Sequence, residues 1–168
     1  MNTVAAVSGL LDAALSYAAR SWRVLPLNGK IPFLTDWPTL ATTDEATVRK
    51  WFDQQPAPNV GIATGKASNL FVLDVDPRNS GDDTLRALEA QYGELPRTIE
   101  VITGGGGRHY YFQYPNVAIG NSAGTLGPGL DVRTDGGQPC SSACRFGCET
   151  RLDVVVPPVT VALSRWGG

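Results

Sequence analysis

The chain has 168 residues, a formal net charge of −2 and 18% charged residues, which suits one domain with a sizeable core. It contains no run of basic residues, so we do not expect tight, salt-driven binding to duplex DNA by this chain alone. Weaker binding of a polynucleotide, with bound metal offsetting an acidic site, is compatible with this charge.

The first apolar stretch, Val4–Ala19, contains Asp12 and has no basic leader, so it is typical of neither a signal peptide nor a membrane span. Its apolar residues recur every three or four positions, which predicts a helix over about residues 3–20. Three cysteines lie between Cys140 and Cys148, and this odd number implies no disulfide framework. We therefore expect a cytoplasmic protein.

Apolar patterns and turn residues predict alternating strands and helices along the rest of the chain. The expected strands are Trp22–Leu27, Val60–Thr64, Leu70–Asp74, Thr98–Thr103, Tyr110–Tyr114 and Gly129–Arg133. Only the turn Gly65–Ser68 separates the second strand from the third, so we expect these two to form a hairpin. One helix should begin at a capping box, Thr42–Glu45, and another at Asp82–Asp83, ending at Gly93.

The stretch Phe71–Asp76 reads Phe-Val-Leu-Asp-Val-Asp, three apolar residues followed by two spaced carboxylates. Residues two apart on a strand point to the same face, so Asp74 and Asp76 should project side by side. Such carboxylates raise each other's pKa unless a cation joins them, and Mg²⁺ or Mn²⁺ is the natural partner. Replacing one carboxylate could then even raise the thermal stability of the metal-free protein. An acidic turn leaving the core is the alternative interpretation.

Four glycines, Gly104–Gly107, precede Arg108 and His109, the only histidine in the chain. A glycine run lets backbone approach a ligand closely, and the arginine and histidine add donors and positive charge suited to a triphosphate. A loose hairpin with a structural histidine is the alternative, since the run lacks the Gly-Lys-Ser/Thr of a P-loop. Lys30, in the loop Asn28–Trp37, is a further phosphate-binding candidate or a solvated surface lysine.

Asp131, on the last expected strand, is by itself typical of a carboxylate at a solvated strand edge. The order of the motifs suggests more, because six stretches resemble the bifunctional primase–polymerase (Prim-Pol) domains of the archaeo-eukaryotic primase superfamily. These stretches are Ser21–Pro32, Asn59–Gly65, Val72–Asp76, Gly93–Pro96, Thr103–Phe112 and Gly129–Gly137. The resemblance implies an α/β (α+β) fold, in which an N-terminal α/β module packs on a sheet related to the RNA-recognition motif, with the active site in the cleft between them.

The resemblance also implies roles for particular residues. Asp74, Asp76 and Asp131 match the family's carboxylates, which would hold two Mg²⁺ or Mn²⁺ ions, and His109 matches its nucleotide-binding histidine. Further nucleotide contacts are assigned to Arg108, Gly106, Gly107, Lys30 and Arg133. The family often has serine where Gly107 stands, so one hydroxyl contact is lost here.

The implied activity is template-directed nucleotidyl transfer, as a DNA primase, a DNA polymerase or both. Its substrates would be nucleoside triphosphates and single-stranded DNA with a primer, and a replicative helicase in cis or in trans is the expected partner. One alternative is a haloacid-dehalogenase-like phosphatase, which also uses Asp-x-Asp after a strand but wants Thr or Val where Arg78 stands. Another is a non-catalytic module that binds nucleotides or nucleic acid.

We expect residues 1–168 to form one catalytic domain that is a fragment of, or partner to, a larger replication protein. Residues 138–153 depart from the family pattern and contain Cys140, Cys144 and Cys148. Tetrahedral zinc usually needs four ligands, and the only histidine is assigned elsewhere, so zinc is not expected. This insert buries too few apolar residues to offset its ordering entropy, and we expect it to be irregular, with reactive thiols.

Overall fold

The computed structural model describes residues 3–55, 58–103, 105–136 and 140–141, with the side chains of residues 3–8 and 140–141 left aside. Within these residues the chain forms four α-helices and two antiparallel sheets, which confirms the expected α/β (α+β) class. The chain divides into two compact units. The described parts of unit 1 lie within Met1–Asn69 and Gly136–Ala143, and those of unit 2 lie within Leu70–Asp135.

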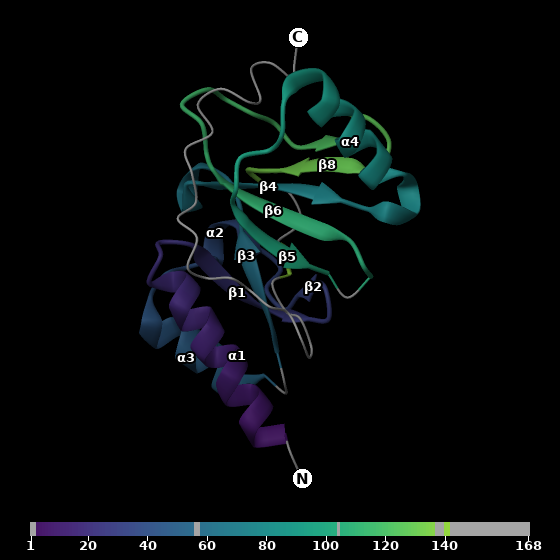
Figure 1. Cartoon of the computed structure of the whole chain (residues 1–168). Helices are drawn as coiled ribbons and strands as arrows, with labels where there is room; N and C mark the ends of the chain where they lie inside the picture. Colours follow the sequence, from purple (N-terminus) through teal and green to yellow (C-terminus); the bar gives the residue numbers. More distant parts are fainter. Residues whose placement is uncertain (1–2, 56–57, 104, 137–139, 142–168) are drawn as a thin grey trace. The chain divides into compact units, whose positions relative to one another are not determined.

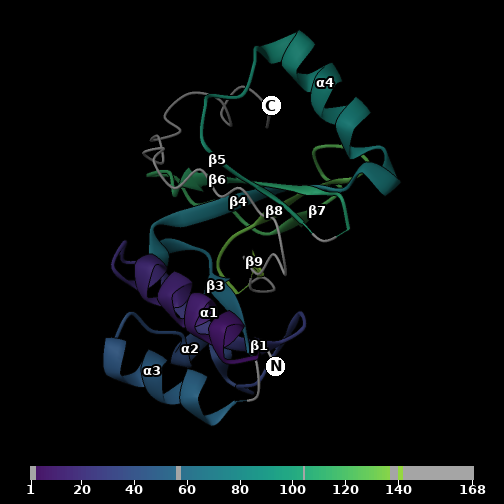
Figure 2. The same ribbon diagram turned by 60° about the horizontal axis from the view of Figure 1, so that its bottom comes forward.

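Unit 1 has a four-stranded sheet in the order β2-β1-β3-β9, with helices packed beside it. Its elements are α1 (Thr3–Ala18), β1 (Arg23–Asn28), β2 (Ile31–Pro32), α2 (Trp37–Leu40), α3 (Glu45–Gln54), β3 (Asn59–Ala63) and β9 (Cys140–Ser141). Helix α1 contacts α3, β1 and β3, and Figure 2 shows α1 beside α3. The predicted helix is confirmed. Among its described side chains the buried ones recur at helical spacing: they are Ala14, Tyr17 and Ala18.

Two local expectations for unit 1 are wrong. The cap of α3 is Asp44, whose side chain accepts a hydrogen bond from the Thr47 N–H, so the helix begins later than a capping box at Thr42 requires. The expected hairpin does not form either, because β3 pairs with β1 and β9, whereas the next strand of the chain joins the other sheet. The short 3₁₀ helix η1 (Lys66–Ser68) and the left-handed Asn69 separate the two strands.

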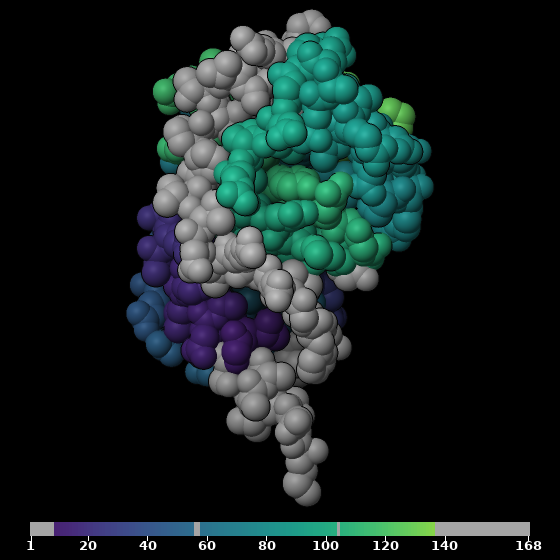
Figure 3. Space-filling model, viewed as in Figure 1, coloured from purple at the N-terminus to yellow at the C-terminus, as the bar shows by residue number. Residues whose placement is uncertain are grey.

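Unit 2 has a five-stranded antiparallel sheet in the order β5-β6-β4-β8-β7. Its elements are β4 (Leu70–Val75), the 3₁₀ helix η2 (Pro77–Asn79), α4 (Gly81–Tyr92), β5 (Ile99–Ile102), β6 (Arg108–Gln113), β7 (Ser122–Ala123) and β8 (Leu130–Arg133). Figure 1 shows α4 across one face of this sheet, and in Figure 3 the same helix forms part of the outer surface of unit 2. As expected from sequence, α4 ends at Gly93, whose φ is +100°.

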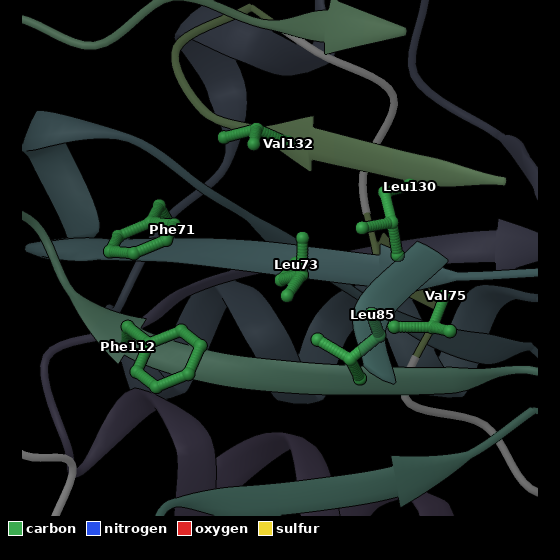
Figure 4. Packing of buried hydrophobic residues seen from close by; sticks show 7 residues of the cluster. All are labelled: Phe71, Leu73, Val75, Leu85, Phe112, Leu130 and Val132. Atoms are coloured by element: carbon green, nitrogen blue, oxygen red, sulfur yellow. The ribbon is translucent and has the colours of Figure 1, made fainter. Parts of the chain in front are cut away.

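The core of unit 2 lies between α4 and the sheet. It contains alternate residues of β4, with side chains from β6, β8 and α4, as Figure 4 shows: Phe71, Leu73, Val75, Leu85, Phe112, Leu130 and Val132. Phe71 stacks on Phe112 with ring centroids 5.3 Å apart. Because side chains alternate along a strand, this packing turns Asp74 to the opposite face of the sheet. A one-residue slip of β4 would turn Asp74 into the apolar core beneath α4, so the register is strongly specified.

Most of the cysteine-containing insert lies outside the described residues, and the predictions about its thiols and zinc stay predictions. Cys140 and Ser141 are an exception to the expected irregularity, because their backbone forms β9 and pairs with Ile62 and Gly61 of β3. Within the part of the chain that the structure describes, no helix is long and apolar enough to cross a bilayer.

Candidate active site

The centre of the site is a row of three side chains across the middle of the unit 2 sheet. Asp74 on β4 is directly opposite His109 on β6 and directly opposite Asp131 on β8. Residues opposite one another in an antiparallel ladder point to the same face, so all three project away from α4. Three residues that are far apart in the sequence are brought together by strand register alone.

Asp74 is paired with two cationic or ionisable groups. Its Oδ2 accepts hydrogen bonds from Arg133 Nε at 2.9 Å and Arg133 Nη2 at 2.6 Å, and its Oδ1 lies 3.4 Å from His109 Nε2. The Asp74 side chain is only 16% exposed. Burial would raise its pKa, but His109 and Arg133 together outweigh burial and lower the pKa of Asp74 to about 2. The carboxylate is therefore ionised at neutral pH.

The sequence predicts that two neighbouring carboxylates raise each other's pKa unless a cation joins them. In the structure the pKa values of Asp74 and Asp76 are both lowered. The reason is that each carboxylate has its own arginine, Arg133 for Asp74 and Arg78 for Asp76. Repulsion is thus already compensated without metal, and removing Asp74 is expected to destabilise the fold.

Asp76 follows β4 and caps η2. Its Oδ1 accepts hydrogen bonds from the Arg78 backbone N–H at 3.0 Å and Arg78 Nε at 3.2 Å, and its Oδ2 accepts one from Asn79 Nδ2 at 2.9 Å. These bonds, those to Arg78 first, lower the pKa of Asp76. Its side chain is 30% exposed, so it is more open to solvent than Asp74.

Close backbone contacts join the end of β4 to the start of β8. The Asp76 N–H donates to the Gly129 carbonyl at 2.9 Å, and the Gly81 N–H donates to the Asp76 carbonyl at 2.9 Å. Gly129 has φ +74°, and a Cβ there would lie 2.5 Å from the Asn79 carbonyl oxygen. These glycines hold the turn containing Asp76 beside the strand that contains Asp131, a role that sequence analysis missed.

Asp131 completes the set of three carboxylates, and its Oδ1 accepts a hydrogen bond from the Gly124 N–H at 2.9 Å. All three side chains offer carboxylate oxygens, the ligands that Mg²⁺ and Mn²⁺ prefer, so the donor set fits such ions. In the geometry of the described residues, no group of three or more His, Cys, Asp or Glu side chains could hold a metal ion together. Joint binding of a metal therefore requires side-chain rearrangement.

The glycine loop packs directly on the end of β4. A Cβ at Gly107 would lie 2.9 Å from the Val75 carbonyl oxygen and 3.1 Å from Thr103 Oγ1, while the Thr103 N–H donates to the Gly107 carbonyl at 2.7 Å. Glycine at this position is therefore required by close packing. The serine that the family often has there would need the backbone to move.

The structure places Arg108 and His109 on opposite faces of the sheet. Arg108 lies on the α4 side, where it forms a close ion pair with Asp82 and a longer one, 3.9 Å, with Glu100. Its guanidinium also lies 5.6 Å from the centre of the Tyr110 ring. These ion pairs join α4 and β5 to the start of β6. Arg108 and His109 point to opposite faces because they are neighbours on one strand. The predicted contact of Arg108 with the triphosphate stays a prediction.

Lys30 lies in the turn between β1 and β2 in unit 1, and it is exposed. The side chain of Asn59 holds this turn through a 2.8 Å hydrogen bond from Nδ2 to the Gly29 carbonyl. The expected contact of Lys30 with a nucleotide stays a prediction.

A family model described as bifunctional DNA primase/polymerase, N-terminal, matches residues 14–143. The chain belongs to this family. Membership supports DNA primase/polymerase activity in DNA replication and implies nucleotide and DNA substrates for this Prim-Pol domain, in a family that is generally metal-dependent. A search of curated proteins found no match. The family match favours this activity over the phosphatase alternative.

Proposed function

We propose that this Prim-Pol domain transfers nucleotides to a DNA strand under the direction of a single-stranded template, as a primase, a polymerase or both. The observation that carries the proposal is the row His109, Asp74 and Asp131 on one face of the sheet. A histidine and two carboxylates from three adjacent strands, with a strongly lowered pKa at Asp74, form the kind of cluster that is typical of functional sites.

Asp74, Asp76 and Asp131 would hold two divalent ions, Mg²⁺ or Mn²⁺. Bound ions of this kind lower the pKa of an attacking hydroxyl and neutralise the charge of a triphosphate. Among the described residues Asp74 Oδ1 pairs with His109 alone, whereas Oδ2 accepts two hydrogen bonds from Arg133, so Oδ1 is the oxygen with remaining acceptor capacity. Asp76 and Asp131 would exchange hydrogen bonds to Arg78, Asn79 and Gly124 for the ions.

His109 is proposed to contact the phosphates of the incoming nucleotide. Its side chain is 10% exposed, and its Nδ1 is buried without a hydrogen-bond partner among the described residues. Buried polar atoms are normally satisfied, so an imidazole left in this state favours a role with a ligand. Arg133 acts on the carboxylate, since its two hydrogen bonds keep Asp74 ionised and fixed in orientation.

The test is incorporation of labelled nucleotides on a single-stranded template with Mg²⁺ or Mn²⁺, with and without a primer. Asp74→Asn keeps the shape of the side chain and removes its charge. We expect a loss of about a hundredfold or more, because even outer-shell partners of metal ligands cost about 10–100-fold when removed. Asp83→Asn is the matched control, because Asp83 is 77% exposed and its ion pair is with Arg86 on the same helix, α4.

Product formed only with a primer would define a polymerase, and product without a primer would define a primase. Near-normal incorporation by a folded Asp74→Asn protein would refute the assignment of the site. A wild-type protein that binds nucleotide yet incorporates none with either ion would favour a non-catalytic binding module.

A further inference from the structure

Arg78 is an exposed arginine next to the proposed metal carboxylates, and its guanidinium contributes little to the stability of the fold. It lies in η2, two residues after Asp76, and its side chain is 71% exposed. Its Nε donates to Asp76 Oδ1 at 3.2 Å, an oxygen that already accepts the Arg78 backbone N–H at 3.0 Å. Exposed ion pairs contribute little to stability, so the cap of η2 does not depend on the guanidinium.

The outer part of the Arg78 guanidinium lies against the glycine loop. A Cβ at Gly105 would lie 3.5 Å from Arg78 Nη2 and 3.7 Å from Cζ, and Gly105 has no side chain to cover this group. Within the described parts of the chain, Nη1 and Nη2 make no hydrogen bond or ion pair. Arg133 differs, because both its Nε and its Nη2 donate to Asp74.

The backbone around Arg78 is held from both sides. Asp76 and Asn79 hold η2 through their side chains, and Gly107 packs within 3.6 Å of Pro77 Cδ, measured from an added Cβ. The end of β4, η2 and the glycine loop therefore present one guanidinium fork beside Asp76. Such a planar fork matches two oxygens of a phosphate at once, which a lysine cannot do.

We propose that Arg78 binds the triphosphate of the incoming nucleotide. This inference rests on the proposed function, since Asp76 would hold an ion that the same triphosphate contacts. Arg78, in place of Arg108, would then be the arginine that binds the triphosphate, since Arg108 forms an ion pair with Asp82 on the other face of the sheet. The nucleotide is favoured over the DNA strand because Arg78 is bonded to a proposed metal carboxylate.

The test compares Arg78→Gln, Arg78→Lys and the control Arg86→Gln. Arg86 is 73% exposed and forms an ion pair with Asp83, so its replacement removes the same charge from a similar surface. Two equilibrium affinities are measured, one for a non-hydrolysable nucleoside triphosphate with Mg²⁺ and one for single-stranded DNA, alongside KM and kcat for incorporation. Circular dichroism and thermal melting check each fold.

We expect Arg78→Gln to weaken nucleotide binding by about 10–100-fold, the range for loss of charge-assisted hydrogen bonds. KM should rise more than kcat falls, Arg78→Lys should recover part of the affinity, and DNA affinity should match that of Arg86→Gln. Unchanged nucleotide affinity overturns the inference. So does an equal loss of DNA affinity, which would assign Arg78 to the strand.

The two proposals can fail separately. If wild type incorporates nucleotides, Asp74→Asn does not, and Arg78→Gln binds the analogue normally, the active-site assignment stands and the role of Arg78 is wrong. If Arg78→Gln fails to fold, Arg78→Lys decides. Weakened analogue binding by that variant supports the inference, and binding equal to that of wild type overturns it.

Discussion

Replacing Asp74 with asparagine should destabilise the metal-free protein. The pKa of Asp74 falls from 3.8 to about 2 on folding, because His109 and Arg133 outweigh the cost of burial. At about 1.4 kcal/mol per pKa unit, the ionised carboxylate contributes roughly 2 kcal/mol at neutral pH. The side chain is only 16% exposed, so solvent screening removes little of this. Asparagine keeps the shape of the side chain but removes the negative charge that faces His109 and Arg133.

The assay is thermal and urea unfolding of both proteins at pH 7 in excess chelator. A loss of roughly 2 kcal/mol corresponds to a melting temperature lower by about 4–8 °C for a chain of this size. Asp83→Asn is again the control, because an exposed pair of this kind is worth at most about 1 kcal/mol.

The pH dependence of the unfolding free energy tests independently whether ionised Asp74 stabilises or destabilises the fold. A carboxyl group whose pKa is depressed by folding stabilises the protein above its unfolded pKa, and the stabilisation is lost as the pH falls through the folded pKa. The difference between wild type and Asp74→Asn should be full above about pH 4 and vanish near pH 2. If Asp74→Asn is as stable as wild type at pH 7, or more stable, then repulsion between carboxylates dominates and this reasoning is wrong.

Two further predictions concern the turn and the histidine. Gly129→Ala should lower the free energy of unfolding by about 2–4 kcal/mol, because an added Cβ meets backbone at 2.5 Å. Gly136 has a similar φ of +69° but open space around it, so Gly136→Ala should lower this free energy by only about 1–2 kcal/mol. Equal losses in urea unfolding would show that φ alone matters. His109→Ala should weaken equilibrium binding of a triphosphate analogue more than binding of single-stranded DNA, and equal losses would assign the histidine a structural role.

Local sequence patterns predicted most elements of the fold. Helical spacing located α1, glycine located the end of α4, alternation located β5, and short segments bounded by turn residues located β6 and β8. Strand pairing could not be read locally, because it depends on contacts between distant segments. The turn after β3 therefore suggested a hairpin, while the structure pairs β4 with β6 and β8.

For the candidate site, too, local patterns were predictable from the sequence and contacts between distant segments were not. The order of motifs pointed to Asp74, His109 and Asp131, and the structure aligns these three on one face. The partners of Asp74 could not be foreseen, because Arg133 reaches it only through the register of β8 on β4. The tight contact between Gly129 and η2 is equally non-local, as it depends on backbone packing between segments about fifty residues apart.

The most direct test of the account is primer extension by Asp131→Asn with Mg²⁺ or Mn²⁺. Asp131 is the member of the row that its local sequence would assign to a solvated strand edge, whereas the structure puts it directly opposite Asp74. We expect extension to fall by about a hundredfold or more, with a melting temperature near that of wild type. Extension at the wild-type rate would mean that the row of His109, Asp74 and Asp131 is not the catalytic centre.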